Sequence, residues 1–382
     1  MLNKKKILLL TDWYEPGFKA GGPVQSCKNF VSAMQDDYNL FIITSDKDFG
    51  DTEPYKSIAI NEWIKKNETV HLYYSDPKKL TSAKLKELVN FINPDYIYLN
   101  SLYSVHFTIF PLWLKKINSI AAEIIISPRG MLQQGALQFK SAKKKLFIQL
   151  LNLSGIAKQL IFHATDEQES KDVLKYFPTA KKIVVIPNLP KTEVMEWKQI
   201  SKQKNELKCV FISRLSPKKN LLFLLNVIKQ LPANINLQLN LYGEVEDDLY
   251  WKKCLEIINE LDSNISVQYN HAVPNNLVPE ILHQHHLFVL PTLGENFGHA
   301  IFEALLAGKP VLISNKTPWI NLQEKQIGHD LPLDDIAFKH ALIFYADMNQ
   351  SAYDEWSKNA FEFSQNYIAT SDTVKKYKEL FS

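Results

Sequence analysis

Short apolar runs alternate with amphipathic helical patterns along most of this chain, and this alternation limits the possible folds more than any other feature. Strands separated by helices run parallel, so the pattern predicts an α/β fold with parallel sheets that are buried on both faces. In the first half the expected strands are Ile7–Leu10, Leu40–Thr44, Tyr96–Leu99, Glu123–Ile126, Leu160–His163 and Ile183–Ile186. The expected helices are Val24–Met34, Leu80–Ile92 and Asp166–Tyr176, the last capped by Thr165.

The alternation stops in a polar, lysine-rich stretch and then begins again, which indicates two domains. A chain of 382 residues also exceeds what one hydrophobic core usually organises. We expect a first domain over 1–188, a linker over 189–205 and a second domain over 206–365, with a C-terminal helix of about 366–382 completing the first domain. Expected strands of the second half are Cys209–Ser213, Leu237–Leu241, Ile265–Tyr269, Leu287–Leu290 and Val311–Ile313, and expected helices are Leu221–Leu231, Leu249–Leu261, His299–Ala307 and the pattern Tyr353–Phe381.

Composition excludes several classes of protein. A net charge of +3, from 44 basic and 41 acidic residues, gives no electrostatic case for a nucleic-acid partner. Three scattered cysteines, Cys27, Cys209 and Cys254, fit neither a disulfide framework nor a zinc site, so we expect a reducing, cytoplasmic setting. The apolar run Ile7–Leu10 is cut short by Asp12 and is interpreted as a strand rather than an export signal, and no apolar run is long enough to predict a transmembrane helix.

A loop followed by a helix in the second half has the chemistry of a site for a phosphate and for hydroxyl groups. Gly298, at the end of the loop, lets the backbone approach a ligand, and the helix start offers free amides to a phosphate. Glu303, inside that helix, would accept hydrogen bonds from ribose hydroxyls, and Glu295 on the loop would face the transferred group. The alternative is that Glu303 is a solvated helix carboxylate and Gly298 an ordinary turn.

Two cations follow the first strand of the second domain and would lie at the same edge of the sheet. Arg214 and Lys219 suit a diphosphate by charge and geometry, although either residue alone could be a surface cation. A strand-end glycine, Gly243, follows the next strand.

Together these motifs resemble glycosyltransferase family 4, the group 1 glycosyl transferases, whose GT-B fold consists of two facing Rossmann-like domains with a cleft between them. The resemblance is strong from about 210 to 311 and looser before that. It implies that Arg214 and Lys219 bind the donor diphosphate, that Glu295 binds the donor sugar, and that Glu303 binds the ribose. Gly243, Asn296, Phe297 and Gly298 complete the donor-binding set that the resemblance implies.

The first half resembles the family less closely. Gly21 and Gly22 resemble its glycine-rich loop near the donor phosphate, although an uncommitted βα turn is the alternative. Arg129 lies in a segment that resembles one at the inter-domain cleft and would contact acceptor or donor. His106 lies near the expected position of an active-site histidine, with a core histidine as the alternative. His271 belongs to a segment that departs from the glycine-bearing one that flanks the nucleobase in the family.

The resemblance implies a retaining, hexosyltransferase-type glycosyltransferase. It would move a sugar from a nucleoside-diphosphate sugar, with UDP or GDP, to a hydroxyl of a lipid-linked or growing cell-surface polysaccharide. The nucleotide sugar is a co-substrate, no cofactor is expected, and no metal site is predicted, because no Asp-x-Asp triplet lies in a suitable loop. The alternatives are another GT-B enzyme such as a sugar-nucleotide epimerase, a non-enzymatic two-lobed binding protein, and an NAD-dependent oxidoreductase, whose glycine fingerprint is missing.

A basic segment in the first half suggests where the acceptor would be met. The range 139–151 combines lysines with an apolar stripe of Phe139, Leu146, Phe147, Leu150 and Leu151 at helical spacing. Contact with an anionic membrane surface is one interpretation, and the resemblance favours it, because such enzymes often use lipid-linked acceptors. A helix packed on its own core, with solvated lysines, is the other. The protein would then be cytoplasmic and peripheral on the inner face of the cell membrane.

Overall fold

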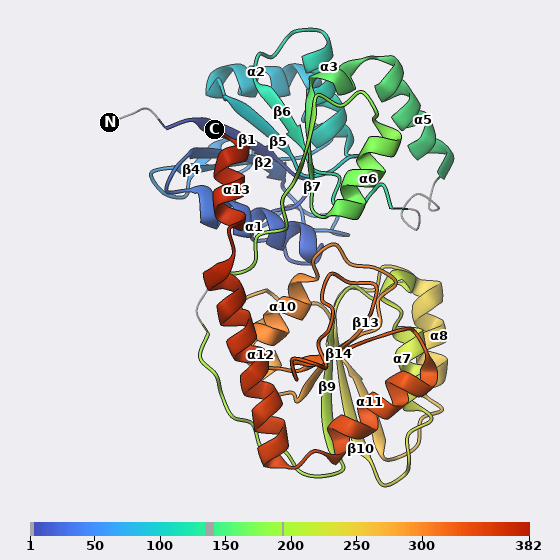
Figure 1. Cartoon of the computed structure of the whole chain (residues 1–382). Coiled ribbons are helices and arrows are strands. Elements are labelled where there is room, and N and C mark those ends of the chain that lie inside the picture. Colours follow the sequence, from blue (N-terminus) through green and yellow to red (C-terminus); the bar gives the residue numbers. More distant parts are fainter. Residues whose placement is uncertain (1–3, 134–140, 193–194) are drawn as a thin grey trace. The chain divides into compact units, whose positions relative to one another are not determined.

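The structure is a computed structural model that describes residues 4–133, 141–192 and 195–382. The chain divides into two compact units, and Figure 1 labels many of their elements. Unit 1 comprises residues 1–189 and 372–382, and unit 2 comprises residues 190–371. None of the helices in these described ranges is long and apolar enough to cross a membrane.

Unit 1 is built on an eight-stranded sheet in which only β3 runs antiparallel to its neighbour. The strand order is β3-β4-β2-β1-β5-β6-β7-β8. Its strands are β1 (Lys6–Leu10), β2 (Asn39–Ser45), β3 (Trp63–Lys65), β4 (Val70–Ser75), β5 (Tyr96–Leu99), β6 (Glu123–Ile126), β7 (Leu160–Ala164) and β8 (Lys182–Val185). Its helices are α1 (Gly22–Met34), α2 (Ser82–Ile92), α3 (Phe110–Lys116), α5 (Ser141–Leu153), α6 (Glu167–Tyr176) and α13 (Thr373–Leu380), with shorter turns η1 (Val105–Ile109) and η2 (Ile156–Gln159).

The sheet of unit 1 is covered on both faces, which explains its almost continuously apolar strands. Successive side chains of a strand point to opposite faces, so Leu8 and Leu10 pack with α2, α3, α5 and α6, whereas Ile7 and Leu9 pack with α1 and α13. The six strands expected in the first half are all present. The hairpin of β3 and β4 was not predicted, because the antiparallel strand β3 has only three residues and carries no clear period.

Unit 2 is a six-stranded parallel sheet with the order β11-β10-β9-β12-β13-β14 and one continuous core. Its strands are β9 (Glu206–Ile212), β10 (Asn236–Tyr242), β11 (Ile265–Tyr269), β12 (Leu287–Leu290), β13 (Val311–Ser314) and β14 (Gly328–Leu331). Its helices are the short turn η3 (Pro217–Lys219), α7 (Leu221–Ile228), α8 (Asp248–Ile258), α9 (Val278–His283), α10 (His299–Leu306), α11 (Asp335–Asp347) and α12 (Gln350–Thr370). The predicted α/β class and doubly wound architecture are confirmed.

Three details differ from the sequence-based expectations. The cap of α6 is Asp166, which accepts a hydrogen bond from the Glu169 amide at 2.7 Å, whereas the Thr165 hydroxyl donates to the Glu169 carboxylate at 2.8 Å. The C-terminal pattern is two helices, and only the second, α13, belongs to unit 1, where the Tyr38 hydroxyl donates to the carbonyl of Lys378 at 3.2 Å.

The expected linker is the third difference, because its described residues after Leu189 belong to unit 2. Lys202 is 4% exposed, and its ammonium group donates to the carbonyls of Gln203, Ala346 and Met348 at 2.7 to 3.1 Å. The indole of Trp197 donates to the Ser357 hydroxyl at 3.0 Å. Polar composition suggested a free linker, but these side chains find their partners only in the folded unit.

Candidate active site

The candidate site of unit 2 lies where its strand order reverses. From β9 the chain moves outward through β10 to β11, and it then returns to the other side of β9 through β12, β13 and β14. All these strands are parallel, so the loops after β9 and β12 leave the same edge of the sheet side by side. Ligands of open α/β sheets bind at such a reversal, beyond the carboxyl ends of the strands.

Lys219 and Glu295 join the two loops at this point. The Lys219 ammonium group contacts the Glu295 carboxylate, and the two side chains are 14% and 13% exposed. The Thr292 hydroxyl donates to the same carboxylate at 3.1 Å. Burial alone would raise the pKa of Glu295, but the charges of Lys219 and Lys218 and these hydrogen bonds hold that pKa below its ordinary value. Glu295 is therefore an ionised carboxylate at neutral pH, held in a fixed position.

Lys218 is a cation of this site to which the sequence analysis assigned no role. Its side chain is exposed, yet partial desolvation lowers the pKa of its ammonium group, and the charges of Lys219 and Arg214 lower that pKa further against the opposing effects of Glu295 and Glu246. The Leu293 amide donates to the Lys218 carbonyl at 2.8 Å, so the backbone of one loop is bound to the other. The signal was present in the sequence, because Lys218 directly precedes the predicted Lys219.

Arg214 lies at the same edge and is paired with a carboxylate that was not predicted. Its Nη1 lies 3.0 Å from Oε1 of Glu246, with side-chain exposures of 30% and 36%. Sequence reasoning singled out Gly243 after β10 and not Glu246, three residues later. Nothing in the spacing indicates the pair, because 32 residues separate its members.

Gly243 is required by the close approach of two strand ends. Its φ is 151°, and a Cβ atom there would lie 1.9 Å from the carbonyl oxygen of Ser213. Any side chain would therefore push β9 and β10 apart. His271, which has a positive φ of 57°, accepts a hydrogen bond from the Gly243 amide at 2.9 Å, and its ring lies 4.5 Å from that of Tyr269.

Helix α10 begins at this edge of the sheet. Gly298, at a φ of 78°, is its N-cap residue, and Glu303 lies half-buried in its second turn. The amides of the first turn have no partner within the helix, which makes its start suitable for an anion. Asn296 is half-buried on the preceding loop. Phe297 is a core residue, 5% exposed against Trp319, so only its backbone is placed to meet a ligand.

The predicted residues of unit 1 gather at its own strand reversal, between β1 and β5. Gly21, at a φ of 67°, is the N-cap residue of α1, and Gly22 is the first residue of that helix. His106 lies half-buried in a π-helical turn after β5, where Nδ1 lies 3.2 Å from the carbonyl oxygen of Leu80. Asp12, which was not predicted, accepts a hydrogen bond at 2.7 Å from Ser104, the residue that caps this turn.

Arg129 is engaged by side chains of unit 1. Its guanidinium donates to Oδ1 of Asn100 at 2.8 Å and to the Tyr98 hydroxyl at 2.9 Å, and it also contacts Asn188. Tyr98 in turn hydrogen-bonds Nδ1 of His163 at 2.8 Å. These contacts tie the ends of several strands together, and contact of Arg129 with a substrate stays a prediction.

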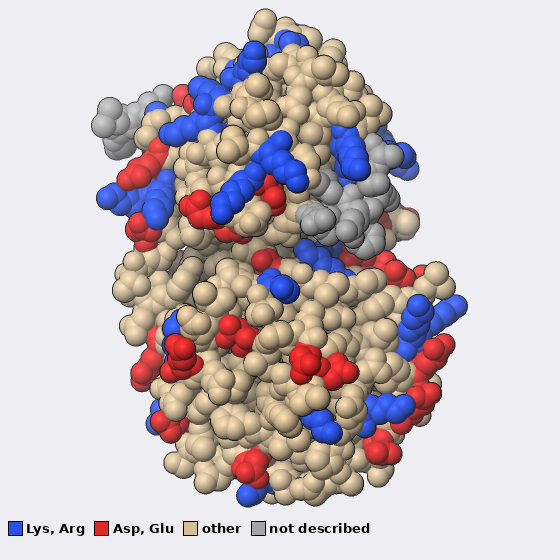
Figure 2. Space-filling view, turned by 45° about the vertical axis from the view of Figure 1, so that its right-hand side comes forward, with Lys and Arg blue, Asp and Glu red and all other residues tan. Residues whose placement is uncertain are grey.

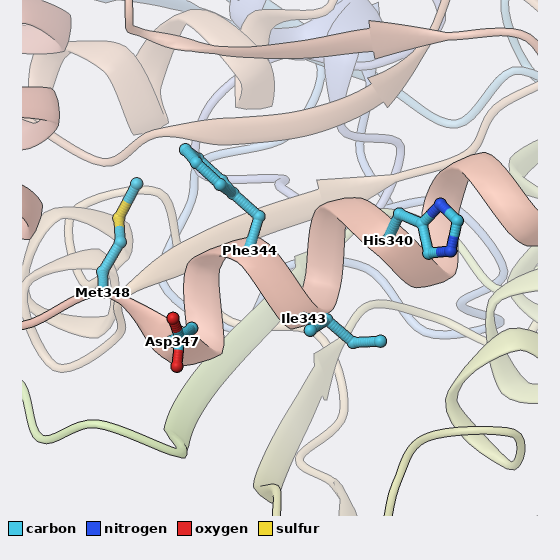
Figure 3. Close-up of a pocket in the computed structure, with 5 residues that line it drawn as sticks. All are labelled: His340, Ile343, Phe344, Asp347 and Met348. Carbon is cyan, nitrogen blue, oxygen red and sulfur yellow. The ribbon is translucent and has the colours of Figure 1, made fainter.

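An open pocket of about 510 Å³ lies on unit 2 (Figure 3). All of its lining side chains come from α11 or the residue after it, and none is a predicted site residue: His340, Ile343, Phe344, Asp347 and Met348. Within the ranges that the structure describes, no group of three or more His, Cys, Asp or Glu side chains is placed to hold a metal ion.

Comparison with known proteins relates this chain to glycosyltransferases. The family model described as glycosyl transferases group 1 matches residues 194–323. Over 112 residues the chain is 30% identical to the O-antigen chain mannosyltransferase B of Escherichia coli, a match that spans 28% of each chain. The chain thus aligns with less than a third of the length of that relative.

Solved structures match over nearly the whole chain. Sucrose-phosphate synthase from Thermosynechococcus elongatus superposes with a TM-score of 0.73 at 15% identity, covering 99% of this chain and 98% of that one. Anabaena Alr3699/HepE in complex with UDP-glucose superposes with a TM-score of 0.66 at 16% identity, covering 98% and 99%. Residues 194–323 therefore match the model of the glycosyl transferases group 1, and the chain as a whole has the GT-B fold of the solved glycosyltransferase structures.

Proposed function

We propose that this chain transfers a hexose, with retention of anomeric configuration, from a UDP- or GDP-sugar to a hydroxyl of a sugar acceptor. The observation that carries the proposal is the Lys219–Glu295 pair at the strand reversal of unit 2, beside the start of α10. One structural neighbour is a complex with UDP-glucose, and one relative is a mannosyltransferase. The first supports a nucleotide sugar as donor, and the second supports a hexose as the transferred group.

The expected chemistry follows from the charges at this edge. When the bond from the sugar to the diphosphate breaks, negative charge develops on the departing phosphate. Arg214, Lys219 and the amides at the start of α10 would stabilise that charge in a partly buried site, where such interactions are stronger than in water. Glu295 would orient the sugar, and Glu303 would accept hydrogen bonds from the ribose. The rate would then depend on cations and alignment rather than on a covalent nucleophile.

Ligand-dependent thermal stability, followed by a transfer assay, tests this proposal. A nucleoside diphosphate at a hundred times its dissociation constant should add about 2.7 kcal/mol to the free energy of unfolding. UDP and GDP are compared with ADP and CDP to identify the base. The matching radiolabelled sugar nucleotides are then incubated with polysaccharide and lipid extracts, and a labelled product is sought. Isomerisation of the donor without transfer would indicate an epimerase, and the absence of any nucleotide effect would contradict the proposal.

For the acceptor we propose a lipid-linked sugar or growing cell-surface polysaccharide, met at an anionic membrane surface through α5. Leu146, Leu150 and Leu153 are 55%, 56% and 83% exposed, whereas Ile148 and Leu151 are buried. The row of exposed leucines follows helical spacing, and Lys143, Lys144 and Lys145 precede it. Figure 2 shows Lys and Arg side chains on unit 1, which carries α5. Phe139 of the predicted stripe and the neighbouring Lys140 lie outside the described residues.

Vesicle co-sedimentation tests the membrane surface. The protein is mixed with phosphatidylcholine vesicles, with and without phosphatidylglycerol, at increasing salt. Binding is expected only to the anionic vesicles and should weaken with salt, because each lysine near the surface contributes about 1 kcal/mol. Leu150→Ser should reduce it, whereas Leu249→Ser, which removes a leucine that is 73% exposed on α8 of unit 2, should not. Equal binding to both vesicle types would exclude the electrostatic attraction.

A further inference from the structure

Glu246 is held beside Arg214 by backbone pairing that continues past the ends of β9 and β10. The Leu215 amide donates to the Glu244 carbonyl at 2.8 Å, and the Glu246 amide donates to the Leu215 carbonyl at 3.1 Å. Leu215 is fully buried and pairs with Val245, which anchors this extension in the core. The backbone of both charged residues is therefore fixed, and their ion pair is a property of the fold rather than a chance meeting of long side chains.

The charges at this edge are closely balanced. The cations are Arg214, Lys218 and Lys219. Arg214 forms an ion pair with Glu246, and Lys219 forms one with Glu295. Glu295 is buried and belongs to the proposed sugar site. Glu246 is 36% exposed, so its side chain is able to turn toward water when another anion takes its place.

We propose that Glu246 is a tethered competitor of the donor diphosphate for the Arg214 guanidinium. This inference rests on the proposed function. Without nucleotide, Glu246 neutralises Arg214, and an arriving diphosphate displaces the carboxylate. Because the carboxylate stays attached nearby, it reclaims Arg214 when the sugar has been transferred and so favours release of the nucleoside diphosphate product. Glu246 thus limits affinity for the nucleotide instead of adding to it.

Glu246 could instead help the nucleotide to bind, and the two roles predict opposite changes in nucleotide affinity when Glu246 is replaced. If Glu246 served to orient Arg214 toward the phosphate, its removal would weaken nucleotide binding, because the guanidinium would lose a fixed position. If it competes, its neutralisation strengthens binding. Charge on an exposed pair is screened by salt, so a competitive effect also decreases as ionic strength rises.

The experiment measures the dissociation constants of UDP and GDP by isothermal titration calorimetry at low and high salt. The proteins are the wild type, Glu246→Gln, Glu246→Ala and the control Glu260→Gln. Glu260 lies in unit 2 and forms an exposed pair with Lys229 at 2.6 Å, so the control makes the same charge change away from the site. We expect both Glu246 variants to bind the preferred nucleotide about three- to tenfold more tightly at low salt, and less so at high salt.

Each result has one meaning. Tighter binding by both Glu246 variants, with the control unchanged, supports the competition. Unchanged or weaker binding by a folded Glu246→Gln protein overturns it while leaving the proposed function intact. An equal gain in Glu260→Gln also overturns it, since net charge alone would then explain the effect. If the wild type binds neither nucleotide, the proposed function fails, and this inference fails with it.

Discussion

The carboxylate of Glu295 lies against the ammonium group of Lys219, and both side chains are almost completely buried at the edge of the parallel sheet in unit 2. A buried ion pair costs desolvation that only good geometry offsets, and removal of one partner leaves an unpaired charge. The nearby pair of Arg214 and Glu246 is about one third exposed and is screened by water. Two cations that look equivalent in the sequence therefore have different roles in stability.

Lys219→Ala should destabilise unit 2, and Arg214→Ala should not. From the sequence, little loss of melting temperature is expected for either variant, but the structure restricts that expectation to Arg214. We expect a loss of about 1 to 3 kcal/mol for Lys219→Ala and at most about 1 kcal/mol for Arg214→Ala. Urea unfolding of both variants checks this, and equal losses would contradict the difference in burial. Both variants should lower turnover at saturating donor.

The Lys219–Glu295 pair should also appear in the pH dependence of stability. The pKa of Glu295 in the folded protein lies below its ordinary value, so the unfolded chain binds more protons between the two values. The free energy of unfolding should therefore rise with pH in this window. The contribution of Glu295 should be fully present above about pH 4.5 and should be lost as pH falls through the folded pKa.

In Lys219→Ala this contribution should shrink or reverse, because burial alone raises the pKa of Glu295. Urea unfolding from about pH 3 to 6 measures it, with Lys229→Ala as the surface control. If the free energy of unfolding changed with pH at the same slope in Lys219→Ala and in the wild type, the ion pair would not be what lowers the pKa of Glu295.

Glu303→Ala should weaken nucleotide binding while leaving the fold intact. Glu303 is half-buried in α10, and loss of a hydrogen bond from a ribose hydroxyl to a charged acceptor costs about 1.5 to 3 kcal/mol. Calorimetric titration measures the change in affinity, with the nucleoside diphosphate that stabilises the wild type against thermal unfolding as ligand. Glu256→Ala, on the exposed face of α8, is the matched control. Unaltered affinity in a folded Glu303→Ala protein would remove Glu303 from the donor site.

Lys309→Met should stabilise the protein at neutral pH. Lys309 is fully buried, its ammonium group has no hydrogen-bond partner among the described residues, and burial lowers its pKa to about 8. The unfolded chain binds more protons between about pH 8 and 10.5, so stability of the wild type should rise with pH across that range.

Replacement by methionine removes the cost of burying the charge, which we expect to add on the order of 1 to 3 kcal/mol at pH 7. Urea unfolding at pH 7 and pH 10 compares the wild type with Lys309→Met. The difference between their free energies of unfolding should be smaller at pH 10. A less stable Lys309→Met at pH 7 would show that the ammonium group is favourably placed.

The sequence by itself determined the α/β class and most strands, because these depend on local information, and it predicted which residues lie at the candidate donor edge. Buried strands need continuous apolar runs, and a loop between a strand and a helix needs glycine at positions such as Gly298. The strand ends carrying Lys219 and Glu295 could be assigned to one edge because parallel strands share it.

Only the tertiary structure decided which of these side chains meet. The pairing of Arg214 with Glu246 and the burial of Lys202 and Lys309 depend on segments far apart in the chain. Composition marks a lysine as polar wherever it stands, but its partner and its exposure depend on the strand order. Local sequence patterns therefore could not predict that the expected linker packs on unit 2 or that these lysines are buried. Both follow from how the chain packs around the sheets.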